Sequence, residues 1–379
     1  MKVLTIFGTR PEAIKLAPVV KALESHGHRF QSTVCVTAQH REMLDQVLRI
    51  FDLQPRYDLD IMKPGQDLYE VTSEVLLKLR DLFDRIRPDI ILVQGDTTTT
   101  FAASLAAFYQ KIRVGHVEAG LRTYDKYRPF PEEINRHLTT VIADYHFAPT
   151  EGAKRHLLGE GVCEDRIYVT GNTVVDALYW ILNQQSAPEY QRKMKAFFSK
   201  ILGRPIDSAR LILVTAHRRE SFGIDFENIC HALREIALKN PDVAIVYPVH
   251  LNPNVQEPVR RVLGGVERIH LIDALEYEPF VYLMNKSFLI LTDSGGIQEE
   301  APSLGKPVLV MREVTERPEA VEAGTAKLVG TQKERILSET QKLLDRPEEY
   351  RKMANVRNPF GDGKAAQRIV GILSQMDKA

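Results

Sequence analysis

Cysteine is scarce in this chain, and the few thiols stand far apart. Cys35, Cys163 and Cys230 are the three cysteines among 379 residues. None belongs to a C-x-x-C pair or has a histidine at metal-ligand spacing, so the sequence predicts no metal site. Unpaired thiols are typical of proteins from a reducing compartment. We therefore predict a cytoplasmic protein.

The chain also lacks an excess of charge of either sign and any long apolar run. Lys plus Arg number 50 and Asp plus Glu number 50, so no overall field draws the protein to nucleic acid or an anionic membrane. The apolar run in the N-terminal MKVLTIFGTRPE is too short for a signal peptide, and no later apolar run reaches membrane-spanning length. The chain length favours two globular domains.

Short runs rich in Val and Ile alternate with longer helical patterns. These runs are KVLTIF, TVCVTA, IILVQ, VGHVE, YHFAP and IYVT, then LILVTA, VAIVYP, IHLI, FLILTD, PVLVM and KLVG. Such βαβ alternation predicts the α/β class, with parallel sheets covered by helices on both faces. The pattern restarts after a polar, helical stretch over residues 184–208. We predict two Rossmann-like, doubly wound domains over residues 1–183 and 209–360, and a final helix over 361–379 that packs back on the first domain.

Ligands of open parallel sheets bind beyond the carboxyl ends of the strands, so the residues that follow each strand are the candidates. After the first strand come Gly8 and Arg10, with Lys15 one helical turn later, and both cations would project toward one anionic group. The G-x-G-x-x-G fingerprint is absent here, which argues against a dinucleotide cofactor. Isolated surface charges are the alternative interpretation of Arg10 and Lys15.

Carboxylates follow two neighbouring strands of the first domain. Asp96 lies two residues after the run IILVQ, and Glu118 directly follows the run VGHV. Glu132 lies further along, in PEEINR. A single strand-end carboxylate is more often a helix N-cap. Three of them together favour acid/base chemistry, because crowded carboxylates raise one another's pKa and one can hold a proton while another is ionised. The threonines at 97–100 predict a capping, ligand-facing turn, because four β-branched residues suit a helix interior poorly.

The second domain offers a turn suited to a nucleotide. In LTDSGGIQEE, the amides of Gly295 and Gly296 would face a diphosphate, while Glu300 would accept hydrogen bonds from ribose hydroxyls. His217 and His250 also follow strands and could bind phosphate or relay protons. Either histidine alone is more often structural.

Together these motifs resemble one family over nearly the whole chain. FGTRPEAIKLAP, TAQHREMLDQ, GDTTTTFAASLAAFY, GHVEAGLRT, PEEINR, TGNTVVDAL, TAHRRESFG, PVHLNPNV and DSGGIQEEAPSLGKPVLV are similar to the bacterial non-hydrolysing UDP-N-acetylglucosamine 2-epimerases. The resemblance implies a GT-B fold, an active site in an interdomain cleft and a homodimer. It also implies conversion between UDP-GlcNAc and UDP-ManNAc without a cofactor. This reaction would supply ManNAc units for surface polysaccharide.

The resemblance assigns roles to particular positions. Asp96, Glu118 and Glu132 match the catalytic carboxylates, with Lys15 and His217 in support, and Lys15, Asp96, Glu118 and His217 would also touch the substrate. The UDP contacts fall on Arg10, Leu275, Phe280, Ser294, Gly295, Gly296, Glu300 and Arg317. At Leu275 the contact would be through the backbone. Gln39, His40, Arg41 and Arg218 match the region where some members bind an activating second UDP-GlcNAc.

Several questions remain open at this level. Which carboxylate is the acid and which the base is undecided, and the cation Arg128 near PEE could favour ionisation of the cluster. A GT-B glycosyltransferase that uses a UDP-sugar, or a UDP-sugar sensor without turnover, are the alternative functions, since fold alone does not fix function.

Overall fold

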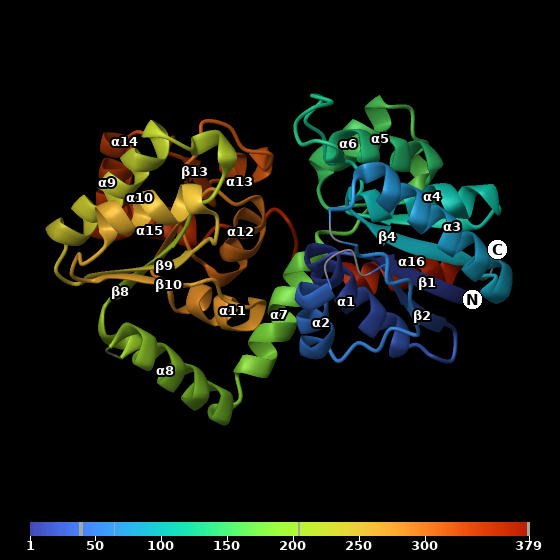
Figure 1. Ribbon diagram of the computed structural model, residues 1–379, viewed down its shortest axis with the longest axis horizontal. Helices are drawn as coiled ribbons and strands as arrows, with labels where there is room; N and C mark the ends of the chain where they lie inside the picture. Colours follow the sequence, from blue (N-terminus) through green and yellow to red (C-terminus); the bar gives the residue numbers. More distant parts are fainter. Residues whose placement is uncertain (38–40, 64, 204, 377–379) are drawn as a thin grey trace. The chain divides into compact units, whose positions relative to one another are not determined.

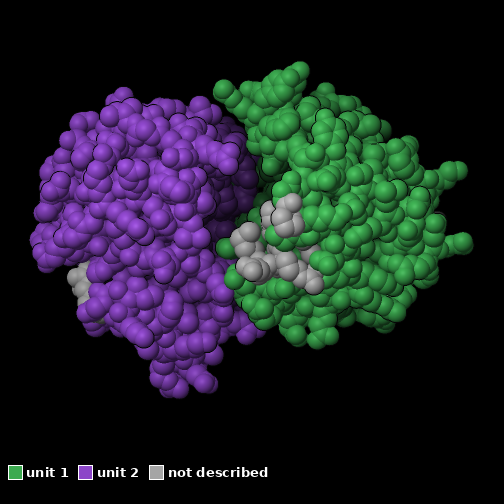
Figure 2. All heavy atoms as spheres, in the orientation of Figure 1, with its two compact units in different colours: residues 1–177, 360–379 green, residues 178–359 purple. Residues whose placement is uncertain are grey.

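The computed structural model describes residues 1–37, 41–63, 65–203 and 205–376. The chain forms two compact units, coloured separately in Figure 2. Unit 1 comprises residues 1–177 and 360–379, and unit 2 comprises residues 178–359. The polar stretch 184–208 lies inside unit 2. Where independently folding domains begin and end stays a prediction.

Within its described residues, unit 1 holds a seven-stranded parallel sheet in the order β3-β2-β1-β4-β5-β6-β7. Its strands are β1 (Lys2–Phe7), β2 (Gln31–Val36), β3 (Tyr57–Asp58), β4 (Ile90–Gln94), β5 (Arg113–Val117), β6 (Tyr145–Ala148) and β7 (Ile167–Val169). Its helices are α1 (Arg10–Glu24), α2 (Arg41–Ile50), α3 (Leu68–Ile86), α4 (Thr98–Tyr109), α5 (Glu132–Ile142), α6 (Glu151–Gly159) and α16 (Ala365–Met376), while α7 (Thr173–Gln185) leads into unit 2. In Figure 1 the red α16 lies beside α1, which it contacts.

The described part of unit 2 holds a six-stranded parallel sheet in the order β10-β9-β8-β11-β12-β13. The strands are β8 (Arg210–Thr215), β9 (Val243–Val249), β10 (Ile269–Asp273), β11 (Leu289–Thr292), β12 (Val308–Val310) and β13 (Ala326–Leu328). The helices are α8 (Pro188–Leu202), α9 (Ile224–Lys239), α10 (Pro253–Leu263), α11 (Tyr277–Lys286), α12 (Gly295–Glu300), α13 (Pro318–Ala323), α14 (Lys333–Asp345) and α15 (Pro347–Ala354).

The predicted α/β class is confirmed. A strand is present at each apolar run named above, and the sequence pattern missed only the two-residue β3, which is too short to show a periodicity. The central strands β1, β4 and β8 are almost wholly buried, as parallel strands between two helical layers must be, whereas the edge strands β3, β7 and β10 are partly exposed. No helix within the described residues combines the length and the apolarity needed to cross a membrane.

The turn between β1 and α1 shows why glycine stands at position 8. A Cβ on Gly8 would lie 2.1 Å from Thr37 Oγ1 and 2.6 Å from Thr99 Oγ1, so no larger residue fits. The next residue, Thr9, is the N-cap of α1 in a capping box with Glu12. The tight turn brings the start of α1 to the carboxyl ends of the neighbouring strands.

The threonine run is only partly the turn that we predicted. Thr97 caps α4 by accepting a hydrogen bond from the Thr100 amide, as expected. Thr98 to Thr100, however, form the first helical turn and are buried. Their hydroxyls are satisfied inside the protein, where Thr100 donates to the Gln94 carbonyl at 2.6 Å and Thr99 bonds Thr37. The prediction of a ligand-facing run was therefore wrong beyond Thr97.

Each sheet reverses its strand order at one point, between β1 and β4 in unit 1 and between β8 and β11 in unit 2. At such a switch point the connections leave in opposite directions, which opens a crevice beyond the strand ends. Asp96 follows β4, and Asp293 follows β11. Both sets of candidate residues therefore lie where this fold binds ligands.

Candidate active site

Glu118 is held by donors from three other elements of unit 1. It follows β5, and its carboxylate pairs with Lys15 Nζ from α1. Gln94 Nε2, at the end of β4, donates to Glu118 Oε1 at 2.9 Å, and Asn172 Nδ2 donates to Oε2 at 2.7 Å. A cation and two amide donors all favour the ionised carboxylate. Lys15 therefore reaches Glu118, one of the candidate carboxylates, from the neighbouring helix.

The backbone of Glu118 is unusual as well. Its φ is +65°, a left-handed conformation that is rare for residues other than glycine. Such a conformation persists only where the surrounding contacts fix it, and it is commonest at functional sites. The three donors that hold the carboxylate supply that constraint.

Two consecutive residues of α5 donate hydrogen bonds to Asp96. Asn135 Nδ2 donates to the Asp96 carbonyl at 3.0 Å, and Arg136 Nη2 donates to its carboxylate. Burial raises the pKa of Asp96, the charge of Arg136 opposes the rise, and the nearby charge of Glu118 adds to it. Asp96 is thus a carboxylate whose protonation depends on its neighbours.

Glu132, the first residue of α5, completes the cluster. Burial raises its pKa, and the charge of Asp96 raises it further. The three predicted carboxylates therefore lie close enough together for their charges to interact. Arg128 does not supply the expected cation: its side chain is 87% exposed and faces Asp125 at 3.9 Å. The cations beside the cluster are Lys15, which contacts Glu118, and Arg136, one helical turn into α5, which contacts Asp96.

His116 supports the turn that carries Asp96. Its side chain is fully buried in β5, and its Nε2–H donates to the Gly95 carbonyl at 2.7 Å. Burial lowers the pKa of His116 to about 3, so the ring is neutral at physiological pH. It is a structural residue of the site.

In unit 2, Asp293 ties together the ends of β8 and β11. This buried carboxylate accepts the backbone N–H of His217 at 2.5 Å and that of Arg218 at 2.7 Å. The His217 ring stacks on His250, with ring centroids 5.2 Å apart. Burial lowers the pKa of His217, and Asp293 only partly opposes this, so neutral imidazole dominates at neutral pH. His217 and His250 therefore act as one stacked pair.

The glycine turn of unit 2 lies against an arginine. Gly295 opens α12, and the place of its missing Cβ is 3.6 Å from Arg317 Cζ. Glu299 holds that guanidinium, with Arg317 Nε 2.5 Å from Oε1. Backbone amides at a helix start and a fixed guanidinium at the same turn suit a phosphate group.

The two glutamates that follow the glycines have different partners. Glu299 is buried against Arg317, whereas Glu300 accepts a hydrogen bond from the Tyr277 hydroxyl at 2.7 Å. Ser294 precedes the turn as the N-cap residue of α12. Unit 2 thus brings Ser294, Gly295, Gly296, Glu300 and Arg317 together, as predicted from the sequence.

The remaining predicted residues are placed as follows. Arg10 begins α1, Phe280 lies in α11, and Leu275 lies in the loop before that helix. Arg218 follows β8 beside His217 and adds positive charge around Glu316, whose pKa falls because Arg312, Arg218 and Arg317 outweigh its burial. Gln39 and His40 lie outside the described residues. Arg41 is the first residue of α2.

Sequence reasoning missed several residues that hold the site. They are Gln94, Asn172, Arg136, Tyr277 and Glu299. Gln94 and Asn172 stand at or just beyond strand ends, so the strand-end rule could have included them. Arg136 stands three residues after Glu133, and a buried i, i+3 ion pair could have been inferred from this spacing.

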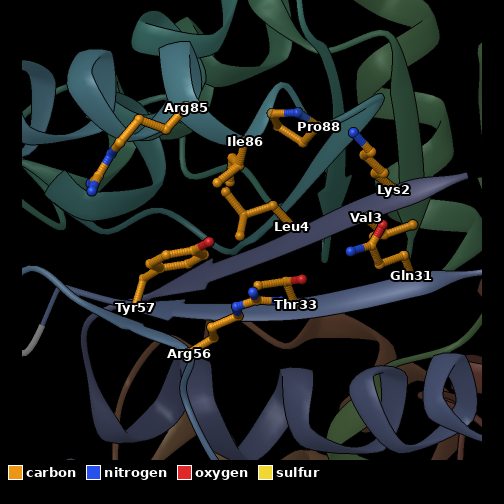
Figure 3. Close-up of a pocket in the computed structure, with 10 residues that line it drawn as sticks. All are labelled: Lys2, Val3, Leu4, Gln31, Thr33, Arg56, Tyr57, Arg85, Ile86 and Pro88. Carbon is orange, nitrogen blue, oxygen red and sulfur yellow. The ribbon is translucent and has the colours of Figure 1, made fainter.

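A separate cavity of about 230 Å³ lies elsewhere in unit 1 (Figure 3). It is lined by Lys2 and Gln31, the first residues of β1 and β2, together with Thr33, Arg56 and Tyr57 among others. It therefore lies at the amino ends of these strands. None of the predicted site residues lines it, and it is not the candidate site.

The sequence matches a family model and close relatives. The model described as UDP-N-acetylglucosamine 2-epimerase matches residues 21–374. The UDP-N-acetylglucosamine 2-epimerase of Escherichia coli (strain K12) is 59% identical over 374 residues, which cover 98% of each chain. That of Yersinia pestis is also 59% identical with the same coverage.

Solved structures agree with these matches. The UDP-GlcNAc 2-epimerase of Neisseria meningitidis, bound to UDP-GlcNAc, superposes with a TM-score of 0.92 at 55% identity, covering 99% of this chain and 100% of that one. The enzyme of Methanocaldococcus jannaschii, in complex with UDP-GlcNAc and UDP, superposes with a TM-score of 0.81 at 37% identity and the same coverage.

Proposed function

The chain belongs to the UDP-N-acetylglucosamine 2-epimerase family, and from this premise we propose that it interconverts UDP-N-acetylglucosamine and UDP-N-acetylmannosamine. The GT-B class follows with the family. The observation that carries the proposal is the group of Asp96, Glu118 and Glu132 beside the β1/β4 switch point, because these three carboxylates have different partners. Inversion at carbon 2 needs both an ionised and a protonated carboxyl group, and three carboxylates with different partners can supply both.

The proposed reaction inverts carbon 2 of the sugar through an elimination. An ionised carboxylate takes the proton from carbon 2 while the bond between carbon 1 and the UDP oxygen breaks, which gives 2-acetamidoglucal and UDP. The UDP oxygen then adds back to carbon 1, and a carboxylic acid delivers a proton to the opposite face of carbon 2. No electrons pass to a cofactor, so none is needed.

The pairing of the carboxylates supports a division of roles. Glu118 and Asp96 each contact a cation, Lys15 and Arg136, and a cation in contact favours the ionised carboxylate. Burial raises the pKa of Asp96 as well as that of Glu132, but Arg136 donates directly to Asp96, so we assign the ionised role to Glu118 and Asp96 and the proton to Glu132. Preorganised charge of this kind stabilises a transition state without rearrangement.

Unit 2 would hold the UDP part of the substrate. Arg317 and the amides of Gly295 and Gly296 would receive the diphosphate, with His217 adding a donor. Glu300 would accept the ribose hydroxyls, oriented by Tyr277. Ser294, Phe280 and the Leu275 backbone complete the predicted contacts with UDP.

We propose a homodimer formed through unit 1. Its adjacent helices α3, α4 and α5 expose large apolar side chains, namely Tyr69, Leu77, Phe108, Tyr109, Leu138 and Val141. Val141 is 85% exposed and Tyr69 is 86% exposed. Apolar side chains gathered on one surface favour a protein interface over contact with water.

A cytoplasmic location is proposed on the free thiols Cys35, Cys163 and Cys230, which suit a reducing compartment. The proposed product is an activated sugar, which a polysaccharide glycosyltransferase would consume. Activation by a second UDP-GlcNAc near Gln39, His40, Arg41 and Arg218 also remains a proposal.

One assay tests the function and separates it from its alternatives. The protein is incubated with UDP-GlcNAc alone in deuterated water. The nucleotide sugars are then separated, and their masses are measured by mass spectrometry. We expect UDP-ManNAc that carries one deuterium at carbon 2. A glycosyltransferase or a sensor would leave UDP-GlcNAc unchanged. UDP-ManNAc without deuterium would refute the exchange of the proton with a carboxyl group.

A further inference from the structure

Arg136 stands between two acidic residues of unit 1 and contacts both. Its Nη1 is 3.1 Å from Glu133 Oε2, and its Nη2 donates to Asp96 Oδ2. The Arg136 side chain is 10% exposed and that of Glu133 is 1% exposed. A guanidinium is planar and its two nitrogens point in fixed directions, so holding one side fixes the other.

Glu133 is itself held by the loop that follows β5. Its Oε1 accepts the backbone N–H of Tyr124 at 2.8 Å and that of Thr123 at 3.1 Å. His137 Nε2 lies 3.2 Å from the same oxygen. Two backbone donors and an arginine partner fix the position of this buried carboxylate. Glu133 therefore anchors Arg136 from the side away from Asp96.

Asp96 faces charges from several elements. Arg136 and Glu132 belong to α5, Lys15 belongs to α1, and Glu118 follows β5. Lys15 is engaged by Glu118. Arg136 donates directly to Asp96, and its charge also acts on Glu132.

Two carboxyl groups whose charges interact titrate as a pair, and a cation bound to one of them places the shared proton on the other. On the basis of the proposed epimerase function, we propose that Arg136, anchored by Glu133, is a positioning residue that keeps Asp96 ionised and leaves the proton on Glu132. Asp96 is then ready to accept the carbon 2 proton and Glu132 to deliver one to the other face. Solvent exchange returns the proton from Asp96 to Glu132 between turnovers.

The test is the pH profile of kcat for Arg136→Gln, measured with UDP-GlcNAc. Loss of the cation raises the pKa of both carboxyl groups, so both limbs of the bell-shaped profile move to higher pH. An opposite charge in contact typically lowers a carboxyl pKa by roughly 1 to 3 units, and Asp96 is partly exposed, so we expect a displacement of about one unit. Damage to the fold alone would lower the height of the bell and leave its limbs in place.

Arg122→Gln is the matched control. Arg122 is a buried arginine of the same region, but it holds Glu160 through two hydrogen bonds of 2.7 Å each. Removing it also breaks an arginine–glutamate ion pair, and the melting temperatures of the two variants are compared. We expect its limbs to coincide with those of the wild-type protein.

Two more variants test the chain of contacts. Arg136→Lys keeps the positive charge without the planar guanidinium, so the limbs of its pH profile should lie between those of the wild type and of Arg136→Gln. This variant takes the place of Arg136→Gln if the glutamine variant folds poorly. Glu133→Gln should lower kcat in the wild-type background and have little further effect beside Arg136→Gln, since Glu133 acts through Arg136. The dissociation constant of UDP should stay within twofold throughout.

The outcomes separate the two proposals. If the wild-type protein forms no UDP-ManNAc, the proposed function fails. If it is active but the limbs of Arg136→Gln and of Arg136→Lys coincide with those of the wild type, the positioning role fails alone. Equal displacement in Arg122→Gln would likewise overturn it.

Discussion

Replacing Glu118 by glutamine should destabilise unit 1 as well as abolish turnover. Three donors contact the carboxylate: Lys15, Gln94 and Asn172. A glutamine side chain has one acceptor oxygen, and its NH₂ group is a donor. At least one of the three donors would then face another donor, and Lys15 would lose its counter-charge.

The size of the effect follows from these contacts. The Lys15 and Glu118 side chains are 13% and 7% exposed, so the pair is largely buried. Removing one partner of a buried pair costs about 3 to 5 kcal/mol, and the residual exposure of Lys15 favours the lower end. A donor left unsatisfied adds about 1 kcal/mol, for a total of about 4 kcal/mol. For a unit of this size, each kcal/mol lowers the melting temperature by roughly 2 to 4 °C, so we expect a fall of roughly 8 to 16 °C.

Thermal unfolding followed by intrinsic fluorescence and circular dichroism measures this shift. The control is Glu118→Gln combined with Lys15→Met, which also removes the cation that Glu118 contacts. The double variant should melt at least 3 °C above the single one, a difference of roughly 1 kcal/mol. A single variant that melts within 2 °C of the wild type, or a double variant that melts lower still, would refute the assignment of the ion pair.

Three further predictions concern ligands and assembly. Glu300→Ala should weaken UDP binding by about tenfold in calorimetry because an acceptor for the ribose is lost, and Tyr277→Phe should weaken it less; an unchanged constant in Glu300→Ala contradicts the ribose role. Val141→Glu should convert the dimer to a monomer in analytical ultracentrifugation, whereas an unchanged sedimentation coefficient would place the interface elsewhere. If a second UDP-GlcNAc activates the enzyme, pure UDP-ManNAc should react with a lag that added UDP-GlcNAc removes, and hyperbolic kinetics from the start would count against it.

The sequence predicted the sheets because their signal is local. A parallel strand buried on both faces is an apolar run, whatever its neighbours are, and the runs such as IILVQ and FLILTD became β4 and β11. Strand ends of parallel sheets face the ligand, so Asp96 and Glu118 could be found from their positions alone. The two-residue β3 has no such signal.

The supporting contacts could not be found in the same way. Whether Arg136 reaches Asp96 depends on how α5 packs beside the end of β4, which is a long-range property of the fold. The same holds for Tyr277, whose hydroxyl meets Glu300 from another element. Arg128 was misjudged because closeness in sequence to Glu132 was taken for closeness in space, and its side chain points to solvent.

The path of the chain through unit 1 has a consequence for protein synthesis. The Asp176 carboxylate accepts the backbone N–H groups of Ala365 and Ala366 at the start of α16, and this helix buries Ile369, Val370 and Leu373. Until the ribosome has made these last residues, the apolar surface that α16 covers is open to water and to other chains. Unit 2, whose residues are contiguous, is complete before unit 1 is. The first unit to leave the ribosome is therefore the last to finish folding, and we expect chains truncated before Ala365 to aggregate through unit 1.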